Sequence, residues 1–135
     1  MSRDEKVLSL RPNLDLSAID KTDMELFQNE TLRPILKVQH ELSLFLLKQH
    51  KNYKLDKVKD MTKEQYDEFI NKYLQTNVDL KNQLLGVMIG LFVSEEMSFY
   101  AEHRKEIHKR IIQMQKKRFV DTFAGGEIVF LLVSL

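Results

Sequence analysis

Apolar residues recur at steps of three and four through most of residues 23–124, and this helical period constrains the fold more than any other feature of the chain. The same period predicts helices over residues 23–50, 62–75, 78–92 and 94–124. The widest apolar stripe predicts burial of the first helix by several neighbours. Its members are Leu32, Ile35, Leu36, Val38, Leu42, Phe45 and Leu46, widened by Leu44 and Leu47.

Pro34 lies inside the first helical pattern. Its ring and its missing N–H predict either a kink or a fresh helix start capped by Asn29 or Thr31. Residues 50–60 are dominated by Lys, Asn and Asp, so we expect a connection there.

Cap signals predict where the later helices begin and end. Thr62 followed by Gln65 has the spacing of a capping box. Ser94, followed by two glutamates, is typical of an N-cap. The glycine pair at residues 125–126 predicts the end of the last helix, after which residues 127–135 form a short, β-prone apolar tail.

These patterns predict an all-α fold, either a four-helix up-and-down bundle or an irregular helical bundle. Residues 1–135 suit a single helical domain, because this length and 43% hydrophobic residues support one core. Residues 1–21 mix charges with isolated apolar residues and show no sustained period. We therefore expect an irregular N-terminal arm over residues 1–21 and a short apolar C-terminal tail over residues 127–135.

Composition excludes several classes of protein. The chain has no Cys, so disulfides, thiolate metal sites and a cysteine nucleophile are excluded, and a cytoplasmic localisation is the simplest expectation. The N-terminal residues carry both signs of charge and resemble no signal peptide. The longest apolar run, Leu84 to Val93, has about half the length of a membrane-spanning helix, so we expect no membrane span.

The four histidines do not have the spacing of a metal site. A di-metal bundle needs Glu-x-x-His pairs, and none of the histidines has a Glu three residues earlier. Glu102, His103 and Glu106 would share a helix face, but basic neighbours would repel a cation. We expect neither a metal nor a cofactor. If the chain is an enzyme, His40, Tyr100 and His103 are the first candidates for catalysis.

The fourth predicted helix carries a run of basic residues. Nucleic acid or an anionic surface could contact such a run through phosphates. No aromatic residue interleaves with the cluster, however, and apolar residues keep helical spacing within it, as in an ordinary bundle helix. Nucleic acid is therefore an unlikely partner. The basic residues are Arg104, Lys105, Lys109, Arg110, Lys116, Lys117 and Arg118.

Three stretches of the sequence carry a family resemblance. They are Arg-Asp-Glu-Lys at residues 3–6, residues 27–37, and Gly-Val-Met-Ile-Gly at residues 86–90 with Glu95 and Glu96. Over about residues 3–122 the chain resembles a family of short, uncharacterised, all-helical bacterial proteins, some of which are labelled "glyoxalase". Glyoxalase I folds place metal-binding His and Glu on sheet strands. The helical period of this chain does not fit that arrangement, so the label implies no catalytic residue here.

From these features we expect a helical interaction module that is non-enzymatic and homo-oligomeric, self-associating and binding a further protein partner. The alternative is a small-ligand-binding or enzymatic bundle with a pocket between helices. A nucleic-acid accessory protein is the third possibility.

The tail adds a separate prediction. Residues 128–133 are consecutively apolar and would favour aggregation if they were free. We expect them to dock in a groove of their own bundle or of a neighbouring subunit.

Overall fold

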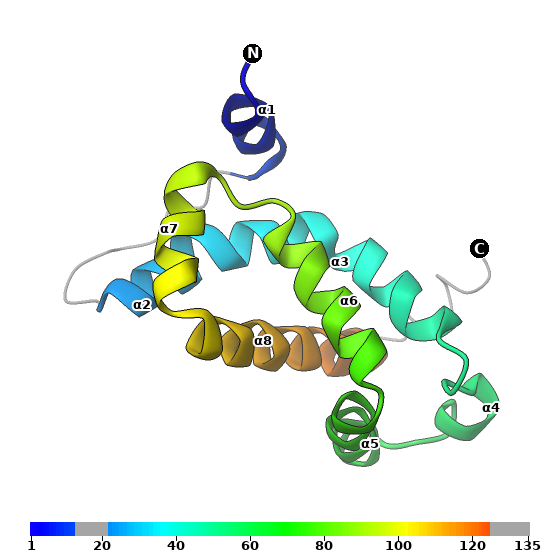
Figure 1. The fold of residues 1–135 in the computed structure, drawn as a ribbon. Helices are drawn as coiled ribbons and strands as arrows, with labels where there is room; N and C mark the ends of the chain where they lie inside the picture. Colours follow the sequence, from blue (N-terminus) through cyan, green and yellow to red (C-terminus); the bar gives the residue numbers. More distant parts are fainter. Residues whose placement is uncertain (13–21, 125–135) are drawn as a thin grey trace.

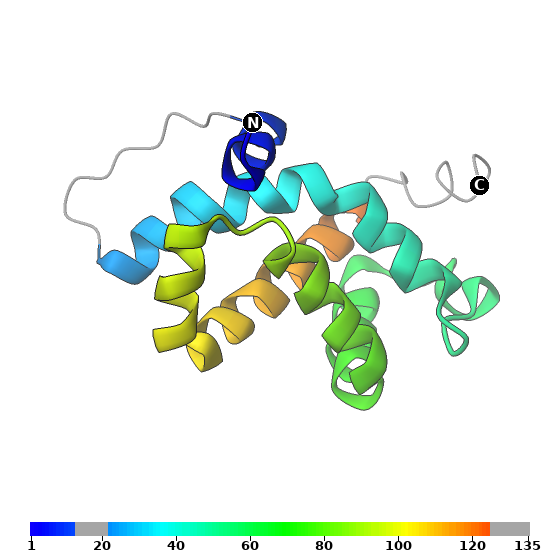
Figure 2. The same cartoon turned by 45° about the horizontal axis from the view of Figure 1, so that its top comes forward.

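The computed structural model describes residues 1–12 and 22–124, and every secondary-structure element within these ranges is helical (Figures 1 and 2). The all-α prediction is confirmed for this part of the chain. The glycine pair at residues 125–126 and the predicted tail at 127–135 lie outside the described residues. The elements are α1 (Arg3–Leu10), α2 (Asp23–Phe27), the π-helical turn η1 (Gln28–Leu32), α3 (Arg33–Gln49), α4 (Leu55–Val58), α5 (Lys63–Thr76), α6 (Val78–Ile89), α7 (Ser94–Glu102) and α8 (Arg104–Ala124).

The four longest helices, α3, α5, α6 and α8, enclose the core. In Figure 1, α3 and α8 lie across the view, α6 packs against both, and α5 is seen end-on against α6 and α8. The four helices are therefore not aligned along one axis. Their apolar faces meet in one cluster, which includes most of the apolar stripe predicted on the first helix. Burial of the whole stripe is wrong, however, because Val38, Leu42 and Phe45 are exposed on the outer side of α3. The fully buried members include Leu32, Ile35, Leu44, Leu47, Tyr66, Ile70, Leu80, Leu84, Met88, Phe92, Ile107, Ile111 and Phe119.

The helical rod does not restart at Pro34. The elements α2, η1 and α3 follow one another without a break, and neither Asn29 nor Thr31 caps a new helix (Figure 2). The predicted fresh start is therefore wrong. Instead, the N–H of Arg33 donates to the carbonyl of Gln28, five residues earlier, which widens one turn just before the proline.

The N-terminal arm is not irregular throughout, because residues 3–10 form α1. The side chain of Ser2 caps this helix by accepting a hydrogen bond from the N–H of Glu5 at 3.2 Å. Val7 is the one buried residue of α1, so a sequence pattern offers little sign of the helix. Contacts with distant parts of the chain hold it in place.

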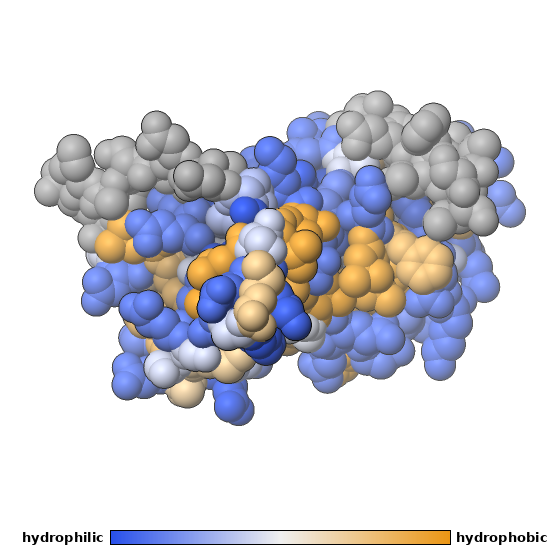
Figure 3. Space-filling model, turned by 90° about the horizontal axis from the view of Figure 1, so that it is seen from above, coloured by the Kyte–Doolittle hydropathy of each residue, from blue (hydrophilic) through white to orange (hydrophobic). Residues whose placement is uncertain are grey.

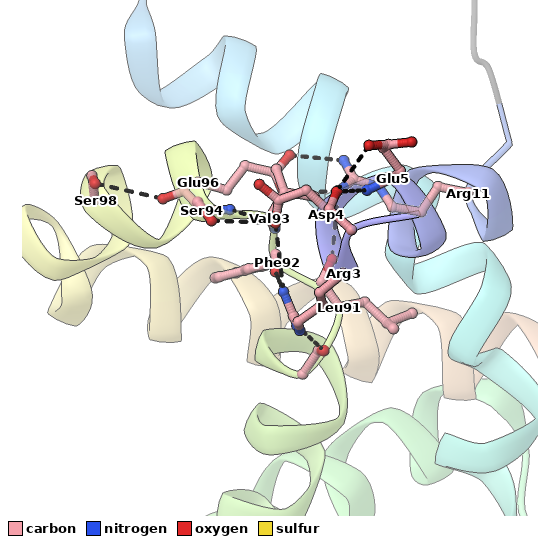
Figure 4. Close-up of polar contacts among 12 residues, drawn as sticks. Arg3, Asp4, Glu5, Arg11, Leu91, Phe92, Val93, Ser94, Glu96 and Ser98 are labelled. Carbon is pink, nitrogen blue, oxygen red and sulfur yellow. Dashed lines mark hydrogen bonds and ion pairs between the residues drawn. The ribbon is translucent and has the colours of Figure 1, made fainter.

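Glu96 is the centre of the first of these contacts, which we name the Glu96 latch (Arg11, Thr31, Val93 and Glu96). Arg11 donates two hydrogen bonds to the carboxylate, at 2.7 and 2.8 Å, and Figure 4 shows the pair side by side. The Thr31 hydroxyl and the Val93 N–H donate two more, at 2.7 and 2.9 Å. Burial alone would raise the pKa of Glu96, but these hydrogen bonds outweigh it and lower the pKa below its usual value.

Arg11 also reaches the rod beside Pro34. Because Pro34 has no N–H, it cannot donate to the carbonyl of Glu30, four residues earlier, as an α-helical residue would. Arg11 donates to this oxygen at 3.2 Å. The guanidinium therefore supplies a donor at the point where the proline removes one.

A second set of contacts ties α1 to the end of α6. The Arg3 guanidinium donates to the carbonyls of Gly90 and Phe92, at 2.8 and 2.7 Å. Asp4 accepts a hydrogen bond from the N–H of Ser94 at 3.1 Å. The N-cap of α7 is Val93 rather than Ser94, so the predicted cap is one residue too late. Ser94 uses its N–H to hold α1 instead (Figure 4).

The predicted helix over residues 94–124 is two helices. His103, with φ −129° and ψ 28°, ends α7, and α8 leaves in a new direction (Figure 1). The break lets α7 turn its aromatic residues inward: the Phe99 ring stacks on Phe27 at 4.8 Å between centroids. The apolar period continues across the break, so the sequence alone predicts one long helix.

The other end of α3 is held by what we name the His50 latch (His50, Tyr73 and Asp79). The two ring nitrogens of His50 lie 2.6 Å from the Tyr73 hydroxyl and 3.0 Å from an Asp79 oxygen. The connection predicted over residues 50–60 contains the short helix α4. The predicted capping box of Thr62 and Gln65 is confirmed at the start of α5.

Candidate functional site: a basic groove between α3 and α8

A groove of about 540 Å³ lies between the first half of α3 and residues 110–121 of α8. Residues at steps of three and four on each helix place their side chains along it. We name this site the α3–α8 groove. It is lined by Gln28, Arg33, Leu36, Lys37, Arg110, Gln113, Met114, Lys117, Arg118 and Asp121.

The groove is strongly positive, because five of its lining residues are basic and one is acidic. The acidic residue, Asp121, already pairs with Lys63 of α5 at 3.5 Å. Among the described residues, no carboxylate lies within salt-bridge distance of Lys37, Lys117 or Arg118. These three charges are therefore available to an anionic group.

Two further basic residues are already oriented by the protein. Arg110 donates to the side chain of Gln28 at 2.6 Å and pairs with Glu106 one turn away on α8. Arg33 donates to the Asn29 side chain at 2.9 Å, which is a neutral partner. The positive charge of Arg33 therefore adds to that of the groove, whereas the charge of Arg110 is partly offset by Glu106.

Apolar side chains also line the groove. Leu36 is buried and Met114 is partly buried, and both pack with the core while lining the groove. No aromatic residue lines it. The basic surface continues along α8 past Lys105 and Lys109, which line an adjoining hollow. The site thus combines an apolar floor with a basic rim.

The three residues expected first for catalysis do not meet. His40 of α3 contacts Thr122, near the end of α8, with 3.0 Å between Nε2 and Oγ1. His103 lies just before α8 begins, and its Nδ1 is 3.0 Å from the Phe99 carbonyl. The 21 residues of α8 span roughly 30 Å, so these two histidines lie near opposite ends of that helix.

Tyr100 and His103 lie near one another in sequence, at the end of α7, but they bond to different partners. The Tyr100 hydroxyl hydrogen-bonds to Nε2 of His108 on α8. Burial, together with the nearby charges of Arg104 and Lys81, lowers the pKa of His108. Neither Tyr100 nor His103 lines the α3–α8 groove.

No group of three or more His, Asp or Glu side chains is arranged to share a metal ion anywhere in residues 1–12 and 22–124. The same ranges contain no helix that combines the length and the apolar character needed to cross a membrane.

The sequence does not by itself reveal that residues of α3 line the groove. Arg33 and Lys37 are one turn apart on α3, a spacing that places two charges on one face. That spacing was visible in the sequence, but the apolar stripe of the same helix was the stronger signal. Only the packing of α3 on α8 brings them opposite Arg110, Lys117 and Arg118.

The chain matches no family model, no curated protein and no solved structure in comparisons with known proteins. The family resemblance therefore remains a prediction based on its motifs. Those motifs meet in space: Arg3 reaches the carbonyl of Gly90, and Thr31 donates to Glu96. These two hydrogen bonds join the three stretches to one another.

Gly86 and Gly90 do not serve a close approach of helices. Among the described residues, an added Cβ at Gly86 would have no atom within 4 Å, and one at Gly90 would meet the carbonyl of Gly86 at 3.1 Å, within the same helix end. The carbonyl of Gly90 instead accepts a hydrogen bond from Arg3.

Proposed function

We propose that this protein is a non-enzymatic helical interaction module that binds an acidic segment of a partner protein in the α3–α8 groove. The observation that carries the proposal is the basic rim around an apolar floor. Lys37, Lys117 and Arg118 have no carboxylate partner among the described residues, and the one acidic lining residue is paired with α5.

An amphipathic peptide suits both parts of such a groove. Apolar side chains of the peptide would contact Leu36 and Met114, while its carboxylates would pair with the basic rim. The volume of about 540 Å³ accommodates a few side chains rather than a whole domain. Long-range attraction would also speed the encounter with an acidic partner.

Nucleic acid suits this groove less well. Proteins that bind single strands stack the bases on aromatic side chains, and no aromatic residue lines the groove. A nucleic-acid accessory role is the outcome that would replace this proposal.

Fewer observations support the alternative of an enzymatic or small-ligand-binding bundle. His40, Tyr100 and His103 each bond to a protein group outside the groove. A small anion could bind the basic rim alone, but it would leave the apolar floor unused. For this reason a peptide with both kinds of side chain is the better probe.

The test measures binding of a fluorescent synthetic peptide whose Glu and Leu residues lie on opposite faces of a helix. The critical variant is the double substitution Lys37→Glu and Arg118→Glu, which reverses two charges of the groove. The matched control, Lys57→Glu and Lys72→Glu, makes the same change of net charge at exposed positions on α4 and α5. We expect the groove variant to bind at least about tenfold more weakly and the control to bind as the parent does.

Two results would contradict the proposal. One is equal weakening by both double variants, which would show that only the net charge matters. The other is tighter binding of a 20-base-pair DNA duplex than of the peptide at the same salt concentration. An all-Glu peptide in the same assay separates the apolar contribution from charge, because it can use only the rim.

Self-association is a second candidate property, which the exposed apolar side chains on α3 away from the groove favour if no other part of the chain covers them. A second copy docked on that face would double the molecular mass in solution. Light scattering coupled to gel filtration decides between a monomer and a dimer.

A further inference from the structure

The exposed side of α3 carries an apolar stripe formed by Val38, Leu42 and Phe45. These side chains are 36%, 44% and 42% exposed, and their spacing places them on one face of the helix. The view in Figure 3 looks onto the upper side of the molecule, where apolar surface lies between charged flanks. We name this feature the α3 stripe. It does not belong to the α3–α8 groove.

The end of α8 contacts α3 on the side of the helix away from the α3 stripe. Thr122 hydrogen-bonds to His40 with 3.0 Å between Oγ1 and Nε2. His40 is two residues from both Val38 and Leu42, which places it about 160° from each of them around the helix axis. The last described residue, Ala124, is two positions beyond Thr122, so the chain that follows must pass around α3 to reach the stripe.

The segment that follows is long enough to cover the stripe. Eleven residues, 125–135, extend beyond Ala124 and can span up to roughly 35–40 Å. From Val38 to Phe45 the stripe is seven helical steps long, or roughly 10 Å. This reach exceeds half the circumference of a helix plus the length of the stripe, so the segment can pass around α3 and contact all three side chains.

The chemistry of the segment matches the stripe. Residues 128–133 are Ile-Val-Phe-Leu-Leu-Val, and Glu127 is the one charged residue after Ala124. The segment and the α3 stripe are both apolar, so contact between them removes apolar surface of both from water. The two glycines at 125 and 126 allow the sharp change of direction that a return onto α3 requires.

From the reach of the segment and its match in apolar character, we propose that residues 127–135 bind along the α3 stripe of their own chain. The attachment point favours the chain's own stripe over that of a second copy. Because the link to α8 is short, the segment has an effective concentration in the millimolar range, which exceeds ordinary protein concentrations. The segment thereby occupies the face that would otherwise serve self-association.

Because the chain has no Cys, a single introduced thiol allows a direct test in the full-length protein. A nitroxide label on Ser134→Cys broadens the amide NMR signals of residues near it. We expect broadening at residues 38–46 of α3 and none at residues 63–76 of α5. Absence of broadening on α3 would overturn the proposal.

Mixing separates the chain's own segment from that of a second copy. One protein in the mixture carries the nitroxide and no 15N, and the other carries 15N and no nitroxide. Broadening of the 15N-protein signals can then arise only between two chains. We expect the α3 signals to stay sharp in this mixture. Broadening there would assign the stripe to a second copy and would overturn docking within one chain.

A stripe variant tests the site itself. In labelled protein, Leu42→Gln with Phe45→Gln should remove most of the α3 broadening and lower the melting temperature by roughly 5 °C. The control is Val78→Gln, an exposed apolar residue at the start of α6 that should change neither quantity. Broadening that persists in the double variant would show that the segment binds elsewhere.

Discussion

The Glu96 latch and the His50 latch hold opposite ends of the rod formed by α2, η1 and α3, with different chemistry. The Glu96 latch is a buried ion pair in which Arg11 is 6% and Glu96 is 14% exposed at the side chain. The His50 latch joins a buried histidine to the Tyr73 hydroxyl and to Asp79, whose side chain is 68% exposed. The Glu96 latch depends on a pair of opposite charges that is shielded from water. The His50 latch depends mainly on hydrogen bonds next to aromatic rings.

This difference predicts how each latch fails. Removing one member of a buried ion pair leaves an uncompensated charge, which costs more than losing a neutral hydrogen bond. The two latches should also fail at opposite ends of the pH scale. A carboxylate is the essential group of the first, whereas buried tyrosine hydroxyls surround the second.

The largest effect is expected from Glu96→Gln. The substitution leaves the Arg11 guanidinium buried without its counter-charge, so the free energy of unfolding should fall by about 3–5 kcal/mol. Urea denaturation followed by circular dichroism measures this loss. The neighbouring exposed substitution Glu95→Gln is the control and should stay within about 0.5 kcal/mol of the parent. Equal stability of the two variants would show that the ion pair contributes little.

A smaller loss is expected from His50→Ala. The Tyr73 hydroxyl would lose its buried partner, and the free energy of unfolding should fall by roughly 2 kcal/mol. Asp79→Asn serves as the comparison, because Asp79 is exposed to water and should matter less. The same urea experiment ranks the two latches. A loss for His50→Ala that exceeds that of Glu96→Gln would reverse the comparison.

Alkaline pH should weaken the region around the His50 latch. Burial raises the pKa of Tyr73 and of Tyr53 to about 12, so both hydroxyls stay protonated in the folded chain while the unfolded chain ionises near pH 10. The free energy of unfolding should therefore fall as the pH rises from about 10 to 12. In the variant Tyr53→Phe, the free energy of unfolding should fall by about 1 kcal/mol less than in the parent by pH 11.

Lys48 acts in the opposite direction over a lower range. Burial lowers its pKa to about 8, so the folded chain loses this proton before the unfolded chain does, and stability should rise between pH 8 and 10.5. The contribution of Lys48 to the slope fades above pH 10.5, as the unfolded lysine also loses its proton, so measurements between about pH 11 and 12 report mainly the tyrosines. A flat profile there would contradict the role of the buried hydroxyls.

Acid pH should also weaken the Glu96 latch, because protonation removes the same charge that Glu96→Gln removes. The pKa of Glu96 is lower in the folded chain than its ordinary 4.5, so the stability that it contributes is present above pH 4.5 and is lost as the pH falls through the folded pKa. The gap in stability between the parent and Glu96→Gln should narrow over this range. The gap between the parent and Glu95→Gln should stay constant, and a parallel narrowing would point to a general acid effect.

Local signals in the sequence predicted the fold where the structure is local. The α5 capping box depends on two residues three positions apart, and the core stripe of α3 depends on its own period. Helix α1 was missed because its stability comes from Arg3 and Arg11, whose partners lie far along the chain. The break at His103 was missed because the apolar period runs through it.

The candidate site was predictable only in half. The basic residues of α8 were visible as a run, and their interpretation as a solvated face was reasonable for one helix in isolation. Arg33 and Lys37 gain meaning from the packing of α3 on α8, which is a tertiary property. The hydrogen bonds of His40 and Tyr100 likewise depend on residues of α8, at Thr122 and His108.

The π-turn at Gln28–Leu32 also governs which changes of length the chain can accept. An α-helix rotates by about 100° per residue, and a π-turn holds one residue more than the α-helical pattern needs. Deleting one residue here would give an unbroken α-helix and would leave Met24 and Phe27 at nearly the same angle around the rod axis relative to α3, because the π-turn already absorbs the extra residue. Phe27 would then still face Phe92 and Phe99. The same deletion in the α-helical part of α3 would instead turn the residues before it by about 100° and take Phe27 away from both rings. The core on both sides therefore accepts a change of one residue at this turn and not in the helix that follows.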